Sequence, residues 1–109
     1  MNVRKADYFI ADAELQYQWY AEHARWDVAD RYLAAIAGTC ALIERQPLLG
    51  PVAALIHSRL AEWRFFVVVR PFHRHVAFYE IVDGEVLMRR VLHGHRHLPQ
   101  RLLEPPGAE

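Results

Sequence analysis

Apolar side chains recur every three or four residues through the first half of the chain, which is typical of helices with one buried face. Two adjacent stripes run through the first segment and a single seam with 4-3-4-3 spacing runs through the second. The stripes are Ala11, Leu15 and Trp19 beside Ala13, Tyr17, Tyr20 and Ala24, and the seam is Ala29, Leu33, Ile36, Cys40 and Ile43. A short link between two such segments predicts an antiparallel helical hairpin over about residues 7–46.

Residues at the ends of these segments carry the expected helix signals. A carboxylate at Asp7 or Asp12 is expected to cap the first helix, and Asp27 is expected to cap the second, because a carboxylate accepts hydrogen bonds from the free amides of a first turn. Pro47 ends the second helix.

From residue 62 the apolar period changes to two, which indicates β-strands. The runs 62–70, 74–82 and 85–93 are rich in aromatic and β-branched residues. Asp83 and Gly84 separate the last two runs, and both residue types tolerate the positive φ of a tight hairpin turn. The second half therefore predicts a three-stranded antiparallel meander.

Together these elements predict an α+β fold. An N-terminal αα-hairpin packs on one face of an antiparallel sheet, which consists of a short strand within residues 1–6 plus the C-terminal meander. A short helix is expected to begin at Leu98 and end at Leu103. We expect one domain over residues 1–109, with the hairpin at about 7–46, the meander at about 62–93 and a tail at 98–109.

The composition narrows the class of protein. Of 109 residues, 53% are hydrophobic and 24% are charged, so the chain is neither disordered nor collagen-like. No apolar run approaches the roughly 20 residues of a membrane span, and no secretory signal is visible. The single cysteine, Cys40, lies on an apolar seam and is expected in the core. These features predict a cytoplasmic protein with no membrane contact.

Charge is distributed unevenly although the formal net charge is zero. Residues 55–101 hold eight basic and four acidic side chains, a net of +4, and six of the seven histidines. This region is expected to carry a positive field, but the excess is too small to predict sequence-specific DNA binding.

Three segments of the second half carry a resemblance to a known family. They are Trp63-Arg64-Phe65-Phe66-Val67, Val76-Ala77-Phe78-Tyr79-Glu80-Ile81 and the closing stretch Arg90-Val91-Leu92-His93-Gly94-His95-Arg96-His97. The chain resembles the RelE/ParE superfamily of toxins, specifically its ParE-like branch, whose closing motif has the form Arg-Val-Leu-His-Gly-x-Arg-Asp. One departure is His97, which stands where the branch usually has aspartate.

The resemblance implies the toxin of a type II toxin–antitoxin module of the plasmid-stabilisation, ParDE-like kind. Its partner would be a cognate ParD-like antitoxin, expected to be a ribbon-helix-helix DNA-binding protein, and its target DNA gyrase, which it would inhibit without catalysis. One alternative is a ribosome-dependent mRNA endoribonuclease of the RelE type, and another is a degenerate toxin that acts only as an interaction module. No cofactor is implied.

The resemblance and the charge pattern together give a set of candidate target-binding residues. We expect residues 60–97 to bring Arg64, Arg90 and Arg96 to a common edge. The candidates for target binding are Arg64, Arg74, Tyr79, Arg89, Arg90, His93 and Arg96. If the chain were a ribonuclease, its catalytic candidates would be Arg64, Arg90, His93, Arg96 and His97. The stretch 98–104 lacks the tyrosine found in some ribonuclease relatives, which disfavours that alternative.

Two further groups of side chains bear on binding. His93, His95 and His97 alternate along a strand end, but no carboxylate completes a metal-ligand set, so no metal site is expected. Tyr79, Trp19 and Trp63 are expected mainly as packing residues. The helices carry more aromatic side chains than so small a core hides, and we expect the antitoxin to bind there. The candidates are Tyr17, Tyr20, Trp26 and Tyr32.

Overall fold

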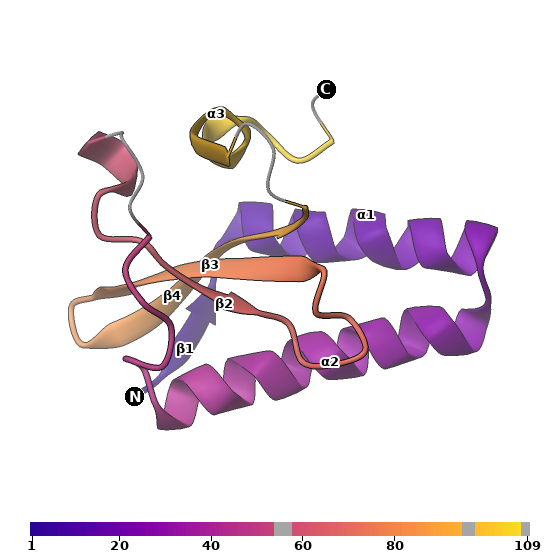
Figure 1. Cartoon of the computed structure of the whole chain (residues 1–109), viewed down its shortest axis with the longest axis horizontal. Coiled ribbons are helices and arrows are strands. Elements are labelled where there is room, and N and C mark those ends of the chain that lie inside the picture. The colour runs from indigo at the N-terminus through magenta and orange to yellow at the C-terminus, as the bar shows by residue number, and fades with distance from the viewer. Residues whose placement is uncertain (54–57, 95–97, 108–109) are drawn as a thin grey trace.

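A computed structural model describes residues 1–53, 58–94 and 98–107. Along the chain the elements are β1 (Val3–Lys5), α1 (Asp7–His23), α2 (Trp26–Arg45), the single-turn helix η1 (Ser58–Leu60), β2 (Arg64–Val67), β3 (His75–Val82), β4 (Glu85–His93) and α3 (Leu98–Leu103). Figure 1 shows the two long helices side by side, with the sheet across them and α3 at the far side. The predicted α+β fold is confirmed.

The four strands form one sheet in the order β1-β4-β3-β2. β2, β3 and β4 make the expected antiparallel meander, whereas β1 runs parallel to β4. A parallel neighbour needs a long crossover, and the α1–α2 hairpin lies within that connection. The turn between β3 and β4 has positive φ at Asp83 and Gly84, as the sequence predicts for this hairpin.

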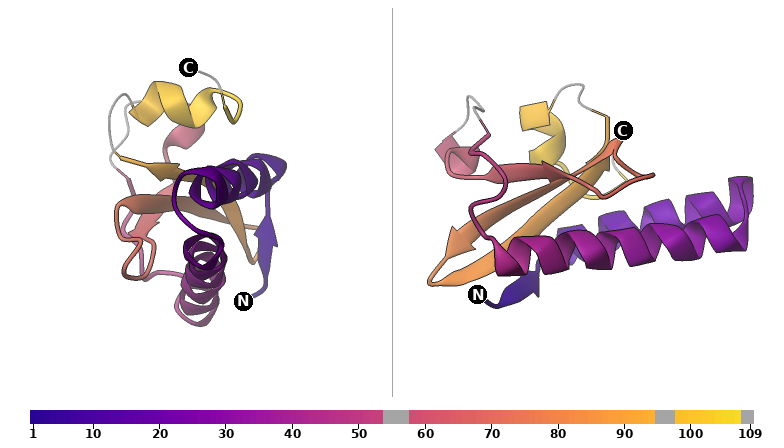
Figure 2. Two further views of the ribbon diagram at one scale, coloured as in Figure 1. Left: turned by 90° about the vertical axis from the view of Figure 1, so that its right-hand side faces the viewer. Right: turned by 60° about the horizontal axis from the view of Figure 1, so that its bottom comes forward.

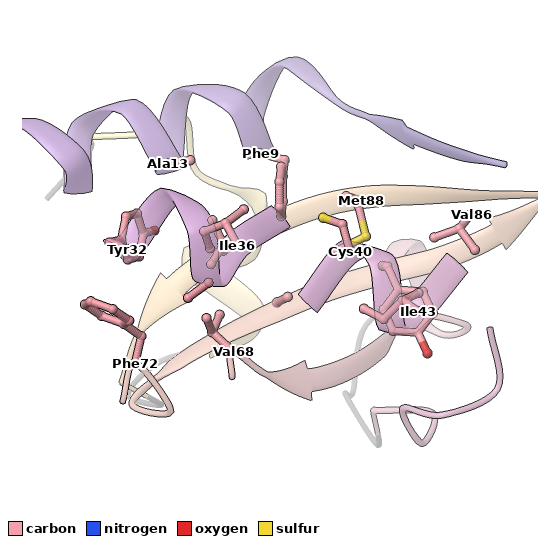
Figure 3. Packing of buried hydrophobic residues seen from close by; sticks show 14 residues of the cluster. Phe9, Ala13, Tyr32, Ile36, Cys40, Ile43, Val68, Phe72, Val86 and Met88 are labelled. Atoms are coloured by element: carbon pink, nitrogen blue, oxygen red, sulfur yellow. The ribbon is translucent and has the colours of Figure 1, made fainter. Parts of the chain in front are cut away.

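The main hydrophobic core lies between the hairpin and one face of the sheet. Figure 3 shows Tyr32, Ile36, Cys40 and Ile43 of α2 against apolar side chains of the strands. Cys40 is buried as predicted, and burial raises the pKa of its thiol. The Tyr32 hydroxyl is buried with no hydrogen-bond partner among the described residues.

A second, smaller core lies on the opposite face of the sheet. Leu60, Trp63, Phe78, Leu92 and Leu102 pack there, contributed by η1, the strands and α3. The molecule therefore has three layers, which the right-hand view of Figure 2 shows with α3 and η1 on one side of the sheet and the hairpin on the other. Trp63 is a core residue, as expected.

The helical pattern overestimated how much of the hairpin is buried. Leu15, Trp19 and Leu33 are exposed, while Phe9 and Tyr32 supply the buried faces. With only one layer of two helices on the sheet, each helix contacts neighbours along a narrow stripe, so a broad apolar face leaves side chains in solvent.

The predicted helix caps were wrong in detail. Ala6 and Arg25 occupy the two N-cap positions, and neither makes a side-chain cap hydrogen bond. Asp7 and Asp27 lie in the first turns, where a carboxylate still interacts favourably with the helix dipole. Asp12 is buried and has a different role. Within the described ranges, no helix has the length and hydrophobicity to cross a membrane.

Candidate functional site

The buried ion pair between Asp12 and Arg90 ties α1 to the strand β4. Arg90 Nε donates to Asp12 Oδ2 at 2.7 Å and Arg90 Nη2 donates to Asp12 Oδ1 at 2.8 Å. The Val91 amide also donates to Asp12 Oδ2, at 3.1 Å. β1 is short and pairs with residues 86–88 of β4, so the same edge of β4 has no neighbouring strand at Val91. The Asp12 carboxylate accepts the Val91 amide hydrogen there in place of a strand.

The remaining guanidinium nitrogen of Arg90 holds the C-terminal segment in place. Nη1 donates to the carbonyl oxygens of Arg101, Leu102 and Glu104 at the end of α3. The last carbonyls of a helix lack a full set of amide partners, and a cation there is favourable. Arg90 therefore joins α1, β4 and α3, and all three of its nitrogens are engaged within the protein.

Arg64 belongs to a different cluster, at the outer strand of the sheet. Arg64 Nη1 donates to the Gly50 carbonyl at 2.8 Å, and the Gly50 amide donates to the Tyr79 hydroxyl at 2.9 Å. The Tyr79 hydroxyl in turn donates to the Pro47 carbonyl at 2.7 Å. A Cβ at Gly50 would lie 2.3 Å from the Phe65 carbonyl oxygen, so the position accepts only glycine. This network fastens the segment after α2 to β2.

Tyr79 has the packing role that was expected of it. Its side chain is fully buried, and burial raises the pKa of its hydroxyl, with the Gly50 amide and Arg64 acting in the opposite direction. The hydroxyl is occupied on both sides by backbone groups. Tyr79 therefore holds the loop that contains Gly50 in place, and its side chain is not accessible to a binding partner.

The expectation that Arg64, Arg90 and Arg96 share one edge was wrong for the two arginines that the structure describes. In the sheet register Arg64 lies directly opposite Tyr79, whose side chain faces the hairpin. Arg90 lies directly opposite Phe78, whose side chain faces α3. The two side chains consequently leave opposite faces of the sheet. Arg96, His95 and His97 lie outside the described residues.

Arg89 adds a charged group to the α3 face because β4 has a bulge opposite Phe78 and Tyr79. Its Nε donates to Glu80 Oε2 at 2.6 Å, and its guanidinium carbon lies 5.6 Å from the centroid of the Trp63 ring. Arg89 remains 38% exposed, unlike Arg90. Arg74 is also exposed, in the turn before β3.

His93 lies at the end of β4 and pairs with His75. The two rings are 4.9 Å apart, and His75 Nε2 shares a 2.8 Å hydrogen bond with the Tyr20 hydroxyl. Burial, together with a smaller effect of the nearby His93, lowers the pKa of His75 to about 4. His75 is thus neutral at physiological pH. The alternation of His73 and His75 in the sequence predicts solvated histidines on a turn, whereas His75 is buried at the first position of β3.

The described ribonuclease candidates do not gather in one cleft. Arg64 donates to the Gly50 carbonyl, and Arg90 is enclosed by Asp12 and α3. His93 lies beside His75, which shares a hydrogen bond with Tyr20. Within residues 1–53, 58–94 and 98–107 no group of three histidine, cysteine or carboxylate side chains is arranged to hold a metal.

Of the four aromatic side chains proposed for partner binding, Trp26 is exposed and Tyr17 and Tyr20 are half-buried. Trp26 is 66% exposed at the start of α2, and Tyr17 lies against it with ring centroids 6.2 Å apart. Tyr17 donates to Asp30, while the half-buried Tyr20 donates or accepts at His75. Tyr32 is fully buried, so its expected place on the binding surface was wrong: it belongs to the core.

Comparison with known proteins identifies the family. The family of the ParE toxin of the type II toxin–antitoxin system parDE matches residues 3–98. The chain belongs to the ParE toxin family. A search of curated proteins found no match. Among solved structures, a chain from the chromosomal ParDE toxin–antitoxin system of P. aeruginosa is similar with a TM-score of 0.71 and 14% identity, covering 87% of this chain and 97% of that one.

Family membership does not depend on the arrangement of the arginines. The similar solved structure supports the ParE fold, and the matched region includes β1, the hairpin and the whole meander. As a ParE-family toxin, this chain uses the motif residue Arg90 to assemble its own layers. That role was visible in the sequence only as a motif position, because its partner Asp12 lies 78 residues away.

Proposed function

We propose that this ParE-family toxin inhibits DNA gyrase by binding it, and that a cognate ParD-like antitoxin of the ribbon-helix-helix class neutralises it in the cytoplasm. The observation that carries the proposal is the family match over residues 3–98. The separation of Arg64, Arg90 and His93 supports binding over RNA cleavage, because general acid–base catalysis requires its groups within hydrogen-bond reach of one substrate.

Antitoxin binding is supported by the aromatic surface of the hairpin. Trp26 and Trp19 are more than half exposed, and Tyr17 lies beside Trp26. Exposed tryptophan and tyrosine are enriched at the centres of protein interfaces because they bury large area at low entropic cost. An amphipathic helix of the antitoxin would cover this surface.

Gyrase binding would use the exposed charged groups of the meander. Among the described arginines of the target-binding set, Arg74 is exposed, and Arg89 is 38% exposed although it is paired with Glu80. Arg64 and Arg90 would act indirectly, by holding the Gly50 loop and the C-terminal segment that flank this surface.

The purified chain, added to a gyrase supercoiling assay and in parallel to a translation reaction with a defined mRNA, tests the target. We expect loss of supercoiling and intact mRNA, and we expect the purified antitoxin to restore supercoiling. Arg74→Gln should weaken inhibition, whereas Arg31→Gln on the exposed side of α2 should not. Cleaved mRNA with normal supercoiling would establish the ribonuclease alternative, and no effect in either reaction would indicate a degenerate toxin.

A further inference from the structure

A groove of about 460 Å³ lies between the outer face of α1 and the C-terminal segment that follows α3. Tyr8, Ala11 and Leu15 line it from α1, at the spacing of three and four residues that places side chains on one face of a helix. Pro106 lines it from the C-terminal segment, which Figure 1 shows running from α3 over α1. We call this surface the α1–tail groove.

The apolar side chains of the α1–tail groove are only partly covered by the fold. Tyr8 is 44% exposed and Leu15 is 47% exposed. The C-terminal segment comes close to this stripe, since a Cβ on Gly107 would lie 3.5 Å from the Leu15 Cδ1 atom. That segment is itself held in place, because the Glu104 carbonyl accepts a hydrogen bond from Arg90. The groove therefore belongs to the folded structure and leaves apolar surface for a partner.

The charge around the α1–tail groove is negative. Asp7 and Glu14 line it, and none of its described lining residues is a lysine or an arginine. Both carboxylates are exposed, and within the described part of the chain neither forms an ion pair. The sequence of α1 holds four carboxylates and no lysine or arginine, and Asp12 is the one that Arg90 neutralises. Unpaired negative charge beside an apolar stripe attracts a cationic partner and repels the phosphates of a nucleic acid or a lipid surface.

Glu14 is the carboxylate of the groove that belongs to this surface alone. Asp7 also borders a neighbouring hollow lined by Arg59 and Arg89, whereas Glu14 does not. The residues three and four positions from Glu14 along α1 are all uncharged, namely Ile10, Ala11, Tyr17 and Gln18. Glu14 therefore remains available to a cation from outside the fold.

The backbone around the groove favours a helical partner over an extended one. The helix α1 directs its backbone groups along its own axis, and Pro105 and Pro106 have no N–H. The described lining of the groove thus offers no strand edge, and an extended segment bound there would leave its own N–H and C=O groups without partners. A helix satisfies its backbone internally, and its side chains repeat at the same spacing as the stripe on α1.

We propose that the α1–tail groove binds an amphipathic helix of a partner protein. The apolar side chains of that helix would cover Tyr8 and Leu15, and a lysine or arginine beside them would pair with Glu14. The surface is separate from the aromatic surface that includes Tyr17, because Leu15 and Tyr17 lie about 200° apart around α1. The proposal does not depend on gyrase as the target or on where the antitoxin binds.

Nuclear magnetic resonance on the full chain tests the groove with three capped peptides of about 14 residues, a length at which a helix becomes marginally stable. The first has leucine at every third or fourth position and lysine beside that stripe. The second has glutamine in place of each lysine, and the third keeps the lysines but has a central proline that breaks the helix. We expect the lysine peptide to shift the Leu15 methyl and Tyr8 ring resonances, and the other two to bind about fivefold more weakly.

Two variants and two matched controls locate the site. Leu15→Ala should weaken the lysine peptide about tenfold, because it removes apolar area from the contact. Glu14→Gln should weaken the lysine peptide about threefold and leave the glutamine peptide unchanged. Leu33→Ala and Glu44→Gln, at exposed residues of α2, should leave both peptides unchanged. Since Glu14 and Leu15 are exposed and substituted separately, a folding defect in one variant leaves the other as evidence.

Several results of these titrations would overturn the proposal. Equal binding of the lysine and glutamine peptides would contradict the role of Glu14, and equal binding of the proline peptide would contradict a helical partner. Unshifted Leu15 and Tyr8 resonances with all three peptides would place no partner in the groove. Leu15 shifts that grow with the concentration of the chain alone would show that a second copy occupies it. The gyrase assay has no part in this test, so failure of either proposal leaves the other intact.

Discussion

Arg90 shows at the residue scale how a motif position can act through the fold. It is 3% exposed, its charge is balanced by Asp12, and its remaining donors hold the end of α3. A buried arginine of this kind specifies the arrangement of the layers rather than contacting a substrate. Its loss would be expected to displace the C-terminal segment before it affects any binding surface directly.

Replacing Asp12 with asparagine should destabilise the protein strongly. The substitution keeps the shape of the side chain but leaves the Arg90 charge buried without a counter-charge, which typically costs about 3–5 kcal/mol. Urea unfolding followed by circular dichroism measures the change in free energy of unfolding. Asp30→Asn, at an exposed carboxylate, should change it by less than about 0.5 kcal/mol. Equal stability of the two variants would show that the buried pair does not hold the layers together.

At the scale of elements, the hairpin has two sides with different roles. Its inner side provides Phe9, Ala13, Tyr32 and Ile36 to the main core. Its outer side leaves Trp26 and other apolar residues in solvent, which is the surface proposed for the antitoxin. The same helical period therefore encodes both packing and a binding surface, and periodicity alone does not separate them.

Replacing Trp26 with alanine should weaken antitoxin binding without affecting the fold. A central tryptophan in an interface typically contributes about 2 kcal/mol or more, which corresponds to roughly thirtyfold in affinity. Isothermal titration calorimetry with the purified antitoxin measures the effect. Leu48→Ala is the control, since Leu48 is 69% exposed in the segment after α2. Unchanged affinity in the Trp26 variant would place the antitoxin on another surface.

At the scale of the whole molecule, two cores and a few polar networks hold three layers together. Asp12 and Arg90 connect the hairpin, the sheet and the C-terminal segment, while Tyr79 and Gly50 connect the segment after α2 to the sheet. His75 lies where α1, α2 and the sheet meet, packed against Tyr20 and Tyr32. Its protonation state therefore affects all of these elements at once.

Stability should fall on mild acidification because His75 is neutral in the folded protein. Its pKa is about 4 when folded and about 6.5 when unfolded, so the unfolded chain binds the extra proton first. The contribution of His75 is complete above pH 6.5 and is lost between pH 6.5 and 4, at up to about 1.4 kcal/mol per pH unit. Urea unfolding across this range should show the slope.

The matched variants for this pH dependence are His75→Gln and His73→Gln. Glutamine at position 75 keeps a hydrogen-bond partner for Tyr20 but does not titrate, so the slope should become shallower. His73 is exposed, and its replacement should leave the slope unchanged. An identical slope in the wild-type protein and the His75 variant would contradict the assignment.

Much of the architecture followed from local pattern. The period of 3.6 over residues 7–46, the period of two over residues 62–93 and the Asp83-Gly84 turn correspond to elements that form between near neighbours. The closing motif led to the ParE-like branch, which the family match confirms. These features are readable because each depends on residues close together in the chain.

The sequence by itself therefore determined the elements, their approximate bounds and the family. Only the tertiary structure decided where the charged and aromatic side chains lie. The pairing of Asp12 with Arg90, the opposite directions of Arg64 and Arg90, and the burial of Tyr32 depend on contacts between segments far apart in the chain. A bulge in β4 and the limited width of a two-helix layer set those contacts, and neither leaves a regular signal in the sequence.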